Sequence, residues 1–159
     1  MAEYSANALQ TLTDASPALT FTETPVPCTK GLIFHRDETP NFTLASPSRI
    51  NGKVWGGCRC NRKMLEAQYE VAFHANIAVS EGGTVGPISL AIAIDGNVDP
   101  SSTMIVTPAA AQDFFNVGAE IVVSVPAICG CDTISIVKTS TGPVDVQNAN
   151  LVINMKGIA

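Results

Sequence analysis

Charged side chains are scarce in this chain. Asp, Glu, Lys and Arg make up 14% of its 159 residues, whereas ordinary soluble domains contain about 25%. The mean hydropathy is correspondingly positive, at +0.24. A single domain with so few charges would expose a large apolar surface as a monomer. The composition therefore predicts a protein that associates with copies of itself.

Long apolar runs are also missing. No stretch of the sequence reaches the roughly 20 apolar residues of a membrane-spanning helix. The first five residues lack the basic head and apolar stretch of a secretory signal. We therefore expect a soluble protein that is made in the cytoplasm and has no membrane partner. The length fits one domain over residues 1–159, with residues 1–16 as an edge or attachment segment.

Catalytic motifs are absent as well. The chain has two histidines, His35 and His74, and neither lies beside a nucleophile motif. It contains no Gly-x-Ser-x-Gly and no Gly-rich phosphate loop between a strand and a helix. Its carboxylates are not paired as glycoside hydrolysis requires, and the net charge of −5 disfavours nucleic acid. The sequence predicts a protein that is not an enzyme, needs no cofactor and binds no nucleic acid.

Strand-like sequence, by contrast, is abundant after residue 68. Runs of apolar and small residues are separated there by turn residues, such as those at 81–83, 95–97 and 141–143. Many short strands with regular turn signals are typical of a sandwich or a barrel. The expected strands of this half are residues 69–79, 87–95, 103–108, 120–126, 132–139 and 148–158.

The first half of the chain has a more broken pattern, and the register of residues 1–65 is not determined by it. We expect strands at residues 6–12 and 18–24, a hairpin formed by residues 31–36 and 41–45, and a loop over residues 46–63. The one helical fragment expected in the second half is a turn or two at residues 109–115. Together these elements predict an all-β fold with about ten strands.

Several expected strands look apolar on both sides. A strand that is apolar on both faces needs cover on both, and in a chain this small the second cover is most simply another copy. The strand at 69–79 has one apolar face and one small, mildly polar face, which another chain can approach closely. The residues that we expect in this contact are Ala72, His74, Asn76, Ala78, Val122, Ser124 and Asn154.

Two segments resemble the tumour necrosis factor and complement-type trimer domain. They are residues 69–79 and residues 148–155. In that family the corresponding strands lie in the inner sheet, which packs around a three-fold axis. The resemblance implies an antiparallel two-sheet jelly-roll sandwich, tumour necrosis factor-like, that forms a homotrimer.

More of the chain resembles small proteins that are coded beside capsid genes in tailed phages of gut Firmicutes. This resemblance implies a virion structural protein made in the host cytoplasm, a trimeric capsid decoration or head-fibre protein whose partner is the capsid protein. The alternative is a carbohydrate- or receptor-binding module at a fibre tip, which would contact a host surface glycan. The segments that carry the resemblance are residues 1–4, 21–28, 76–79, 82–89, 114–117 and 146–151.

Two sites have competing interpretations in a trimer of this kind. If the small face surrounds a three-fold axis, His74 is either a hydrogen-bonded interface residue or part of a metal or anion site, with Asn76 beside it. The run from Asp95 to Asp99 crowds oxygen ligands around a turn. Because its Gly comes second and a distal Glu is missing, it predicts a hairpin turn rather than a calcium site.

A basic segment stands apart in this acidic chain. It holds five of the nine basic residues and no acidic residue interrupts it, so it is either a solvated loop or a contact with an anionic surface. The only tryptophan lies within it and either plugs one end of the barrel or stacks on a sugar. The residues of this candidate surface contact are Arg49, Lys53, Trp55, Arg59, Arg62 and Lys63.

The five cysteines leave alternatives open. Cys58 with Cys60, and Cys129 with Cys131, form two Cys-x-Cys pairs that would bind zinc or cross-link if their turns met. Structural zinc sites usually have two to four residues between the cysteines, so this spacing is a poor match. The other interpretation is that these residues and Cys28 are small, mostly buried thiols.

Overall fold

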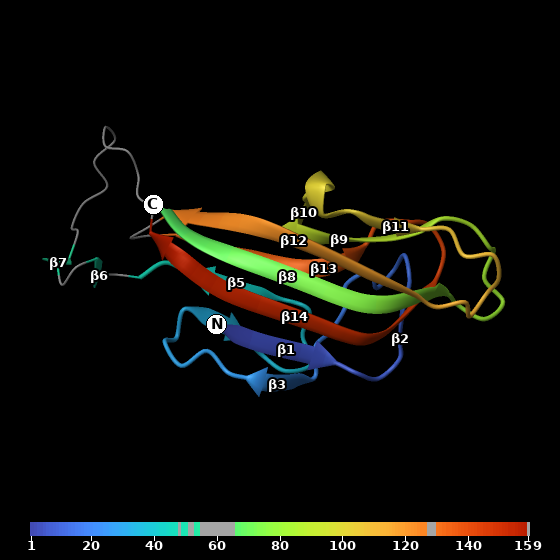
Figure 1. Ribbon diagram of the computed structural model, residues 1–159, viewed down its shortest axis with the longest axis horizontal. Coiled ribbons are helices and arrows are strands. Elements are labelled where there is room, and N and C mark those ends of the chain that lie inside the picture. The colour runs from blue at the N-terminus through green and yellow to red at the C-terminus, as the bar shows by residue number, and fades with distance from the viewer. Residues whose placement is uncertain (48, 51–52, 55–65, 127–129, 159) are drawn as a thin grey trace.

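The computed structural model of the chain describes residues 1–47, 49–50, 53–54, 66–126 and 130–158, with the backbone alone at 49–50 and 53–54. Its strands form two 6-stranded sheets that pack face to face as a sandwich (Figure 1). Neighbouring strands are antiparallel in both sheets. The predicted fold class, an all-β antiparallel two-sheet jelly-roll sandwich, is confirmed.

Sheet A contains the long strands. Its order is β12-β8-β14-β1-β3, and β2 pairs with β14 beside this path. The first and the last strands, β1 and β14, are therefore neighbours, and the strand β14 lies in the middle of the sheet (Figure 1). The strands of sheet A are β1 (Ala2–Ala6), β2 (Gln10–Leu12), β3 (Glu23–Val26), β8 (Glu66–Val79), β12 (Phe115–Pro126) and β14 (Val144–Ile158).

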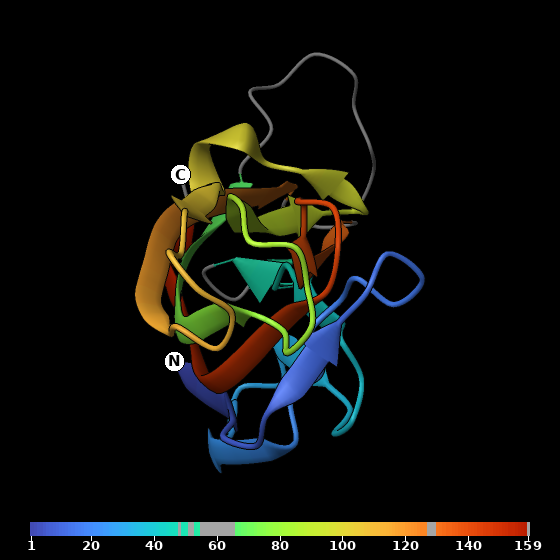
Figure 2. The same ribbon diagram turned by 90° about the vertical axis from the view of Figure 1, so that its right-hand side faces the viewer.

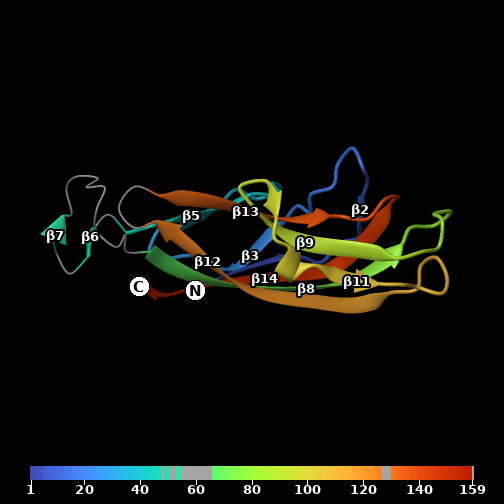
Figure 3. The same ribbon diagram turned by 90° about the horizontal axis from the view of Figure 1, so that it is seen from above.

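Sheet B forms the second layer, which Figure 3 shows opposite sheet A. Its order is β10-β9-β13-β5-β4, and β11 pairs with β9. A separate two-stranded hairpin joins β6 (Arg49–Ile50) to β7 (Lys53–Val54), and η1 (Pro100–Ser102) is a single 3-10 turn. The strands of sheet B are β4 (Ile33–His35), β5 (Phe42–Ala45), β9 (Ile88–Ile94), β10 (Asn97–Val98), β11 (Met104–Val106) and β13 (Cys131–Lys138).

The core lies between the two sheets, which surround it when the molecule is viewed along its long axis (Figure 2). Because successive side chains of a strand point to opposite faces, the apolar positions of β8 alternate with polar ones. Tyr69, Val71, Phe73 and Ile77 point into the core and are at most 2% exposed. The alternation of apolar and polar residues that predicted this strand thus reflects one face in the core and one face outside it.

An aromatic cluster fills the core at its β1 and β5 side. Phe42 contacts Tyr4 at 4.7 Å between ring centroids, Phe21 at 5.1 Å and His35 at 4.1 Å, the last in a stacked arrangement. The ring nitrogens of His35 lie 3.1 Å from the Asn41 carbonyl oxygen and 3.3 Å from that of Phe21. His35 is therefore a structural residue whose ring is held between two backbone carbonyls and the Phe42 ring.

The chain itself covers both faces of β9. Ser89, Ala91 and Ala93, on the side away from the core, are only 9%, 0% and 1% exposed within a single chain. Ser102 of η1 approaches the edge of this strand, where its hydroxyl accepts a hydrogen bond from the Ile92 amide at 2.8 Å. A single chain is therefore enough to cover both faces of β9.

The expected strands of the second half are present, but β12 begins at Phe115 and β14 at Val144, earlier than expected. Other expectations are wrong, and the expected loop at 46–63 contains the hairpin of β6 and β7. The strand expected at 6–12 is two strands, β1 and β2, because the chain breaks between residues 7 and 9. Residues 18–24 form isolated bridges at Ala18 and Phe21 before β3 begins. Residues 109–115 form turns without a helix, and Gln112 there has a positive φ of 63°.

Residues at the start of the chain contribute to the sandwich directly. Ala2, Tyr4 and Ala6 of β1 are at most 3% exposed, and β1 lies between β14 and β3. Pro25 lies in β3, which is the edge strand, where a missing amide donor costs little. Among the described residues there is no helix with the length and hydropathy to cross a membrane.

Candidate functional site

The side of β8, β12 and β14 that points away from the core forms one broad surface, which we call the outer face. Cross-strand register arranges it in rows: Asn116 and Gln147 flank Asn76, and in the next row Gly118 and Asn150 flank His74. Amide and small side chains predominate in these rows. The outer face consists of Gln68, Glu70, Ala72, His74, Asn76, Asn116, Gly118, Glu120, Val122, Ser124, Gln147, Asn150, Val152, Asn154 and Lys156.

Six of the seven expected contact residues lie together on the outer face. They include Val122, which is 60% exposed and is the large apolar side chain most open to solvent there. The exception is Ala78, which is fully buried and pairs with Asp145 in the ladder. The six are Ala72, His74, Asn76, Val122, Ser124 and Asn154.

Charged groups on the outer face lie toward one end. The Lys156 ammonium forms an ion pair with Glu70 at 2.6 Å, and its hydrogen bond holds the pKa of that carboxyl below its usual range. Glu120 follows one row after His74. Glu3, on the neighbouring strand β1, accepts a hydrogen bond from the Asn150 amide at 2.7 Å. The rows of Asn76 and His74 themselves carry no carboxylate or ammonium.

His74 is exposed in the middle of these rows. Within the part of the chain that the structure describes, neither of its ring nitrogens has a hydrogen-bond partner. Directly opposite it on β12 stands Gly118, where an added Cβ would lie 3.1 Å from the Phe73 carbonyl oxygen and 3.5 Å from the His74 Cβ. A side chain at position 118 would therefore be crowded against the β8 backbone.

A buried carboxylate, that of Asp145, lies at the other end of the outer face, beyond the row of Asn76. Asp145 is 4% exposed and accepts hydrogen bonds from the Ser80 and Thr11 hydroxyls, both at 2.6 Å, and from the Gln112 amide at 2.7 Å. Burial alone would raise the pKa of Asp145, but these three hydrogen bonds outweigh it and lower that pKa. The cluster ties the loop before β12 to the ends of β8, β14 and β2.

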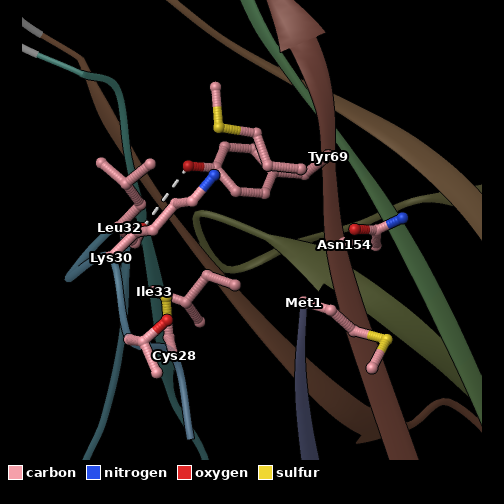
Figure 4. A pocket seen from close by; sticks show the side chains of 9 residues that line it. Met1, Cys28, Lys30, Leu32, Ile33, Tyr69 and Asn154 are labelled. Carbon is pink, nitrogen blue, oxygen red and sulfur yellow. Dashed lines mark hydrogen bonds between the residues drawn. The ribbon is translucent and has the colours of Figure 1, made fainter.

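A pocket of about 170 Å³ lies where β1, β4, β8 and β14 come together (Figure 4). Its lining includes Cys28, Lys30, Tyr69 and Asn154. Tyr69 donates a hydrogen bond to the Ala45 carbonyl at 2.6 Å, and burial raises its pKa to about 12. The pocket is therefore lined by a tyrosine that stays protonated at neutral pH and by a single thiol.

The Cys28 thiol is half-buried in this pocket. Burial raises its pKa, but hydrogen bonds from the backbone amides of residues 30 to 33 act in the opposite direction and bring the pKa below its usual value. A loop of successive amides that points at one atom favours negative charge on that atom. Sequence spacing gave no sign of this arrangement, because the donors are backbone groups.

Most of the basic segment and three of the four paired cysteines lie outside the residues that the structure describes. Trp55, Arg59, Arg62, Lys63, Cys58, Cys60 and Cys129 lie outside the described residues, and Arg49 and Lys53 are described only as backbone of β6 and β7. Cys131 is exposed at the start of β13. The surface-contact and zinc interpretations stay predictions.

The described residues do not form a metal site within one chain. No group of three or more His, Cys, Asp or Glu side chains among them could hold an ion. Asp95 and Gly96 form the tight turn between β9 and β10, with φ of 50° and 78°. Two successive positive φ values are what a two-residue hairpin turn requires, so the turn prediction is confirmed.

The chain has no match among protein families or curated proteins. Solved structures similar to it include the C-terminal domain of EclA, a sugar-binding protein, at 17% identity and a TM-score of 0.35. That match covers 58% of this chain and 64% of the other, so this chain spans slightly less than two thirds of that domain's length.

Two further similar structures are family 35 carbohydrate binding modules. One, from Clostridium thermocellum, is 15% identical and covers 94% of this chain and 90% of its own, with a TM-score of 0.33. The other, from an environmental isolate, is 8% identical and covers 100% and 96%, with a TM-score of 0.38. The strand order of this chain defines its class of protein: an all-β jelly-roll sandwich.

Proposed function

We propose that this chain is a structural protein of a phage particle, a capsid decoration or head-fibre protein, which forms a homotrimer through the outer face. The observation that carries the trimer is the outer face itself: a broad sheet surface in which small and amide side chains predominate, with the exposed Val122 beside Glu70 toward its charged end. The rows of Asn76 and His74 carry no charge, and the cores of protein interfaces are depleted in charged residues in the same way.

The size of the outer face supports this proposal. With about 3.4 Å per residue and about 4.8 Å between strands, the 12 residues of β12 and its two neighbours give a patch of roughly 40 by 14 Å. Stable interfaces bury about 800 Å² on each partner. The patch of roughly 600 Å², together with its margin on β1, is of the right order for self-association.

The strand order also agrees with what the trimer resemblance implies. Residues 69–79 and 148–155 carry that resemblance and were expected in one sheet, and they pair side by side as β8 and β14. The phage particle rests on the sequence resemblance alone. The trimer is argued from the outer face and the phage particle from the sequence, so the two are tested by separate experiments.

Light scattering coupled to size exclusion tests the trimer. The purified protein should elute at about three times its chain mass. Val122→Asp should give a monomer, because it would place a carboxylate without a partner in the interface and deprive it of water. Ile105→Asp is the matched control: Ile105 is 64% exposed on β11 in the other sheet. A wild-type monomer, or a trimeric V122D, would contradict the proposal.

Co-sedimentation tests the particle. Purified protein mixed with emptied capsids of the phage that encodes it should pellet with them at a fixed ratio to the major capsid protein. V122D should bind far more weakly, since a monomer loses the multivalent attachment of a trimer. Absence of the protein from purified particles would refute the structural role and leave the trimer unaffected.

Carbohydrate binding is the second candidate, and the amide-rich rows of the outer face favour it. Amide and carboxylate groups such as those of Asn76, Asn150 and Glu3 can exchange hydrogen bonds with sugar hydroxyls. Glycan-array binding should be lost in Asn150→Ala if this face is the site, and in Trp55→Ala if the basic segment is. A trimer that covers the outer face and shows no glycan binding would exclude this candidate.

A further inference from the structure

We propose that the three His74 side chains of the trimer bind one transition-metal ion on the three-fold axis. The inference rests on the proposed function, because one chain supplies a single imidazole and holds no metal site among its described residues. A trimer with a three-fold axis would bring three copies of the exposed His74 imidazole together. Three imidazoles are a sufficient protein ligand set for a divalent transition metal.

The first reason is that His74 is free to coordinate. The ring is exposed on the central strand β8, and neither nitrogen is hydrogen-bonded within the described residues. The other histidine is the opposite case, since both ring nitrogens of His35 face backbone carbonyls and its ring stacks on Phe42. The fold therefore uses one imidazole and leaves the other available for a ligand.

The second reason is that the position opposite His74 carries no side chain. Gly118 faces His74 across the strand pair. Glycine weakens the interior of a strand, and where one occurs it often marks the close approach of a ligand or of another backbone. Here an added Cβ would come within 3.5 Å of the His74 Cβ. No side chain at position 118 therefore stands between the His74 imidazole and the copy that approaches it.

The third reason is that the row of His74 is uncharged, which favours it near a three-fold axis. A residue on the axis meets its own copies, so a charged side chain there would face two like charges at short range. Glu120, Glu70 and Lys156 are thereby disfavoured on the axis. The rows that contain Asn76 and His74 carry no charge, and His74 is their only side chain that ligates transition metals.

The surrounding charges favour a cation over an anion. Glu120 lies one row from His74 on β12, and Glu3 reaches Asn150, the neighbour of His74 on β14. Lys156, the one ammonium of the outer face, is already paired with Glu70. Three copies of these carboxylates would surround the axis with negative charge, which suits a divalent metal.

Metal uptake by the purified, untagged protein tests the inference. All five cysteines, Cys28, Cys58, Cys60, Cys129 and Cys131, are replaced by serine in every sample, so that thiolates do not compete for the metal. The protein is stripped with EDTA, loaded with Co²⁺, and analysed by light scattering and elemental mass spectrometry. We expect one cobalt ion for every three chains. His74→Gln should reduce uptake to background, and Asn116→Ala, on the same face, should retain it.

The readouts separate this inference from the proposed function. A trimer that takes up no cobalt overturns the metal site and leaves the trimer in place. A protein that stays monomeric with and without cobalt overturns both. Cobalt uptake that is unchanged in H74Q also overturns the metal site. A trimer that forms only when metal is added would support both proposals.

Discussion

At two positions the local environment lowers the pKa of a single side chain, and Asp145 is the first. Its carboxylate accepts three hydrogen bonds from neutral donors that come from different segments. Hydrogen bonds to a charged group contribute about 1.5–3 kcal/mol each when one partner is deleted. We expect Asp145→Asn to lower the free energy of unfolding by about 2 kcal/mol, measured by urea denaturation. The exposed Asp113→Asn should leave it unchanged.

The pH dependence of stability follows from the same residue. The pKa of Asp145 is lower in the folded chain than in the unfolded one. Its contribution to stability is therefore complete above the unfolded pKa, about 3.9, and is lost as the pH falls through the folded pKa. The wild type should lose stability below about pH 4, and D145N should lose less over that range. Parallel profiles for both proteins would contradict this assignment.

Cys28 is the second such position. Because backbone amides lower the pKa of its thiol, the reactive thiolate should persist at a lower pH than in a free cysteine, whose pKa is about 8.5. We expect a variant with Cys28 as its only cysteine to be alkylated by iodoacetamide with a half-maximal rate below about pH 8.5. A variant that retains only Cys131 is the comparison. A rate for Cys28 that rises only above that pH would refute the effect of the amides.

At the scale of elements, turn geometry fixes the register of the β9–β10 hairpin. Gly96 has a φ of 78°, in the left-handed region, where an L-residue costs about 1–2 kcal/mol. Gly96→Ala should therefore lower the free energy of unfolding by that amount in thermal or urea denaturation. Gly157→Ala is the control, because its φ is not positive and nothing lies within 4 Å of the added Cβ. Equal losses in the two variants would contradict the turn assignment.

The sequence predicted best those elements in which apolar and polar residues alternate regularly or a turn motif is present. The apolar alternation around Tyr69 and Phe73 identified β8, and the Asp95-Gly96 turn marked the end of β9. The division into β1 and β2 was missed, because the pattern at residues 6–12 does not show that Ala2 and Tyr4 belong in the core. The turn at 109–115 was taken for a helix because its conformation depends on distant Asp145.

The candidate site was only partly accessible to sequence reasoning, for the same reason. Period two places His74 and Asn76 on one face, so much of the outer face could be foreseen. The role of Gly118 could not, because it depends on which residue of β12 faces His74. The environment of Cys28 depends on the direction of the backbone amides that follow it, which side-chain patterns do not encode. That of Asp145 depends on side chains over 30 residues away, which a single sequence does not bring together.

At the scale of the whole molecule, the core is complete within one chain, whereas the outer face is open. If the chain forms a trimer, unfolding is coupled to dissociation, and the melting temperature depends on protein concentration. A tenfold rise in concentration adds about 1 kcal/mol per chain, which raises Tm of a domain this size by about 2–4 °C. V122D should melt cooperatively at a Tm that is independent of concentration. A concentration-independent wild type would argue for a monomer.

The central place of β14 in sheet A affects how the protein is made. On the ribosome, β1 and β8 emerge first, yet both need β14 as their neighbour. Sheet A therefore stays divided into the pairs β12–β8 and β1–β3 until residues 144–158 have left the exit tunnel, and one edge of β8 and one of β1 stay unpaired during translation. Synthesis that stalls before residue 144 would release a chain with no centre to its larger sheet, and such chains should be recovered as aggregates rather than as folded fragments.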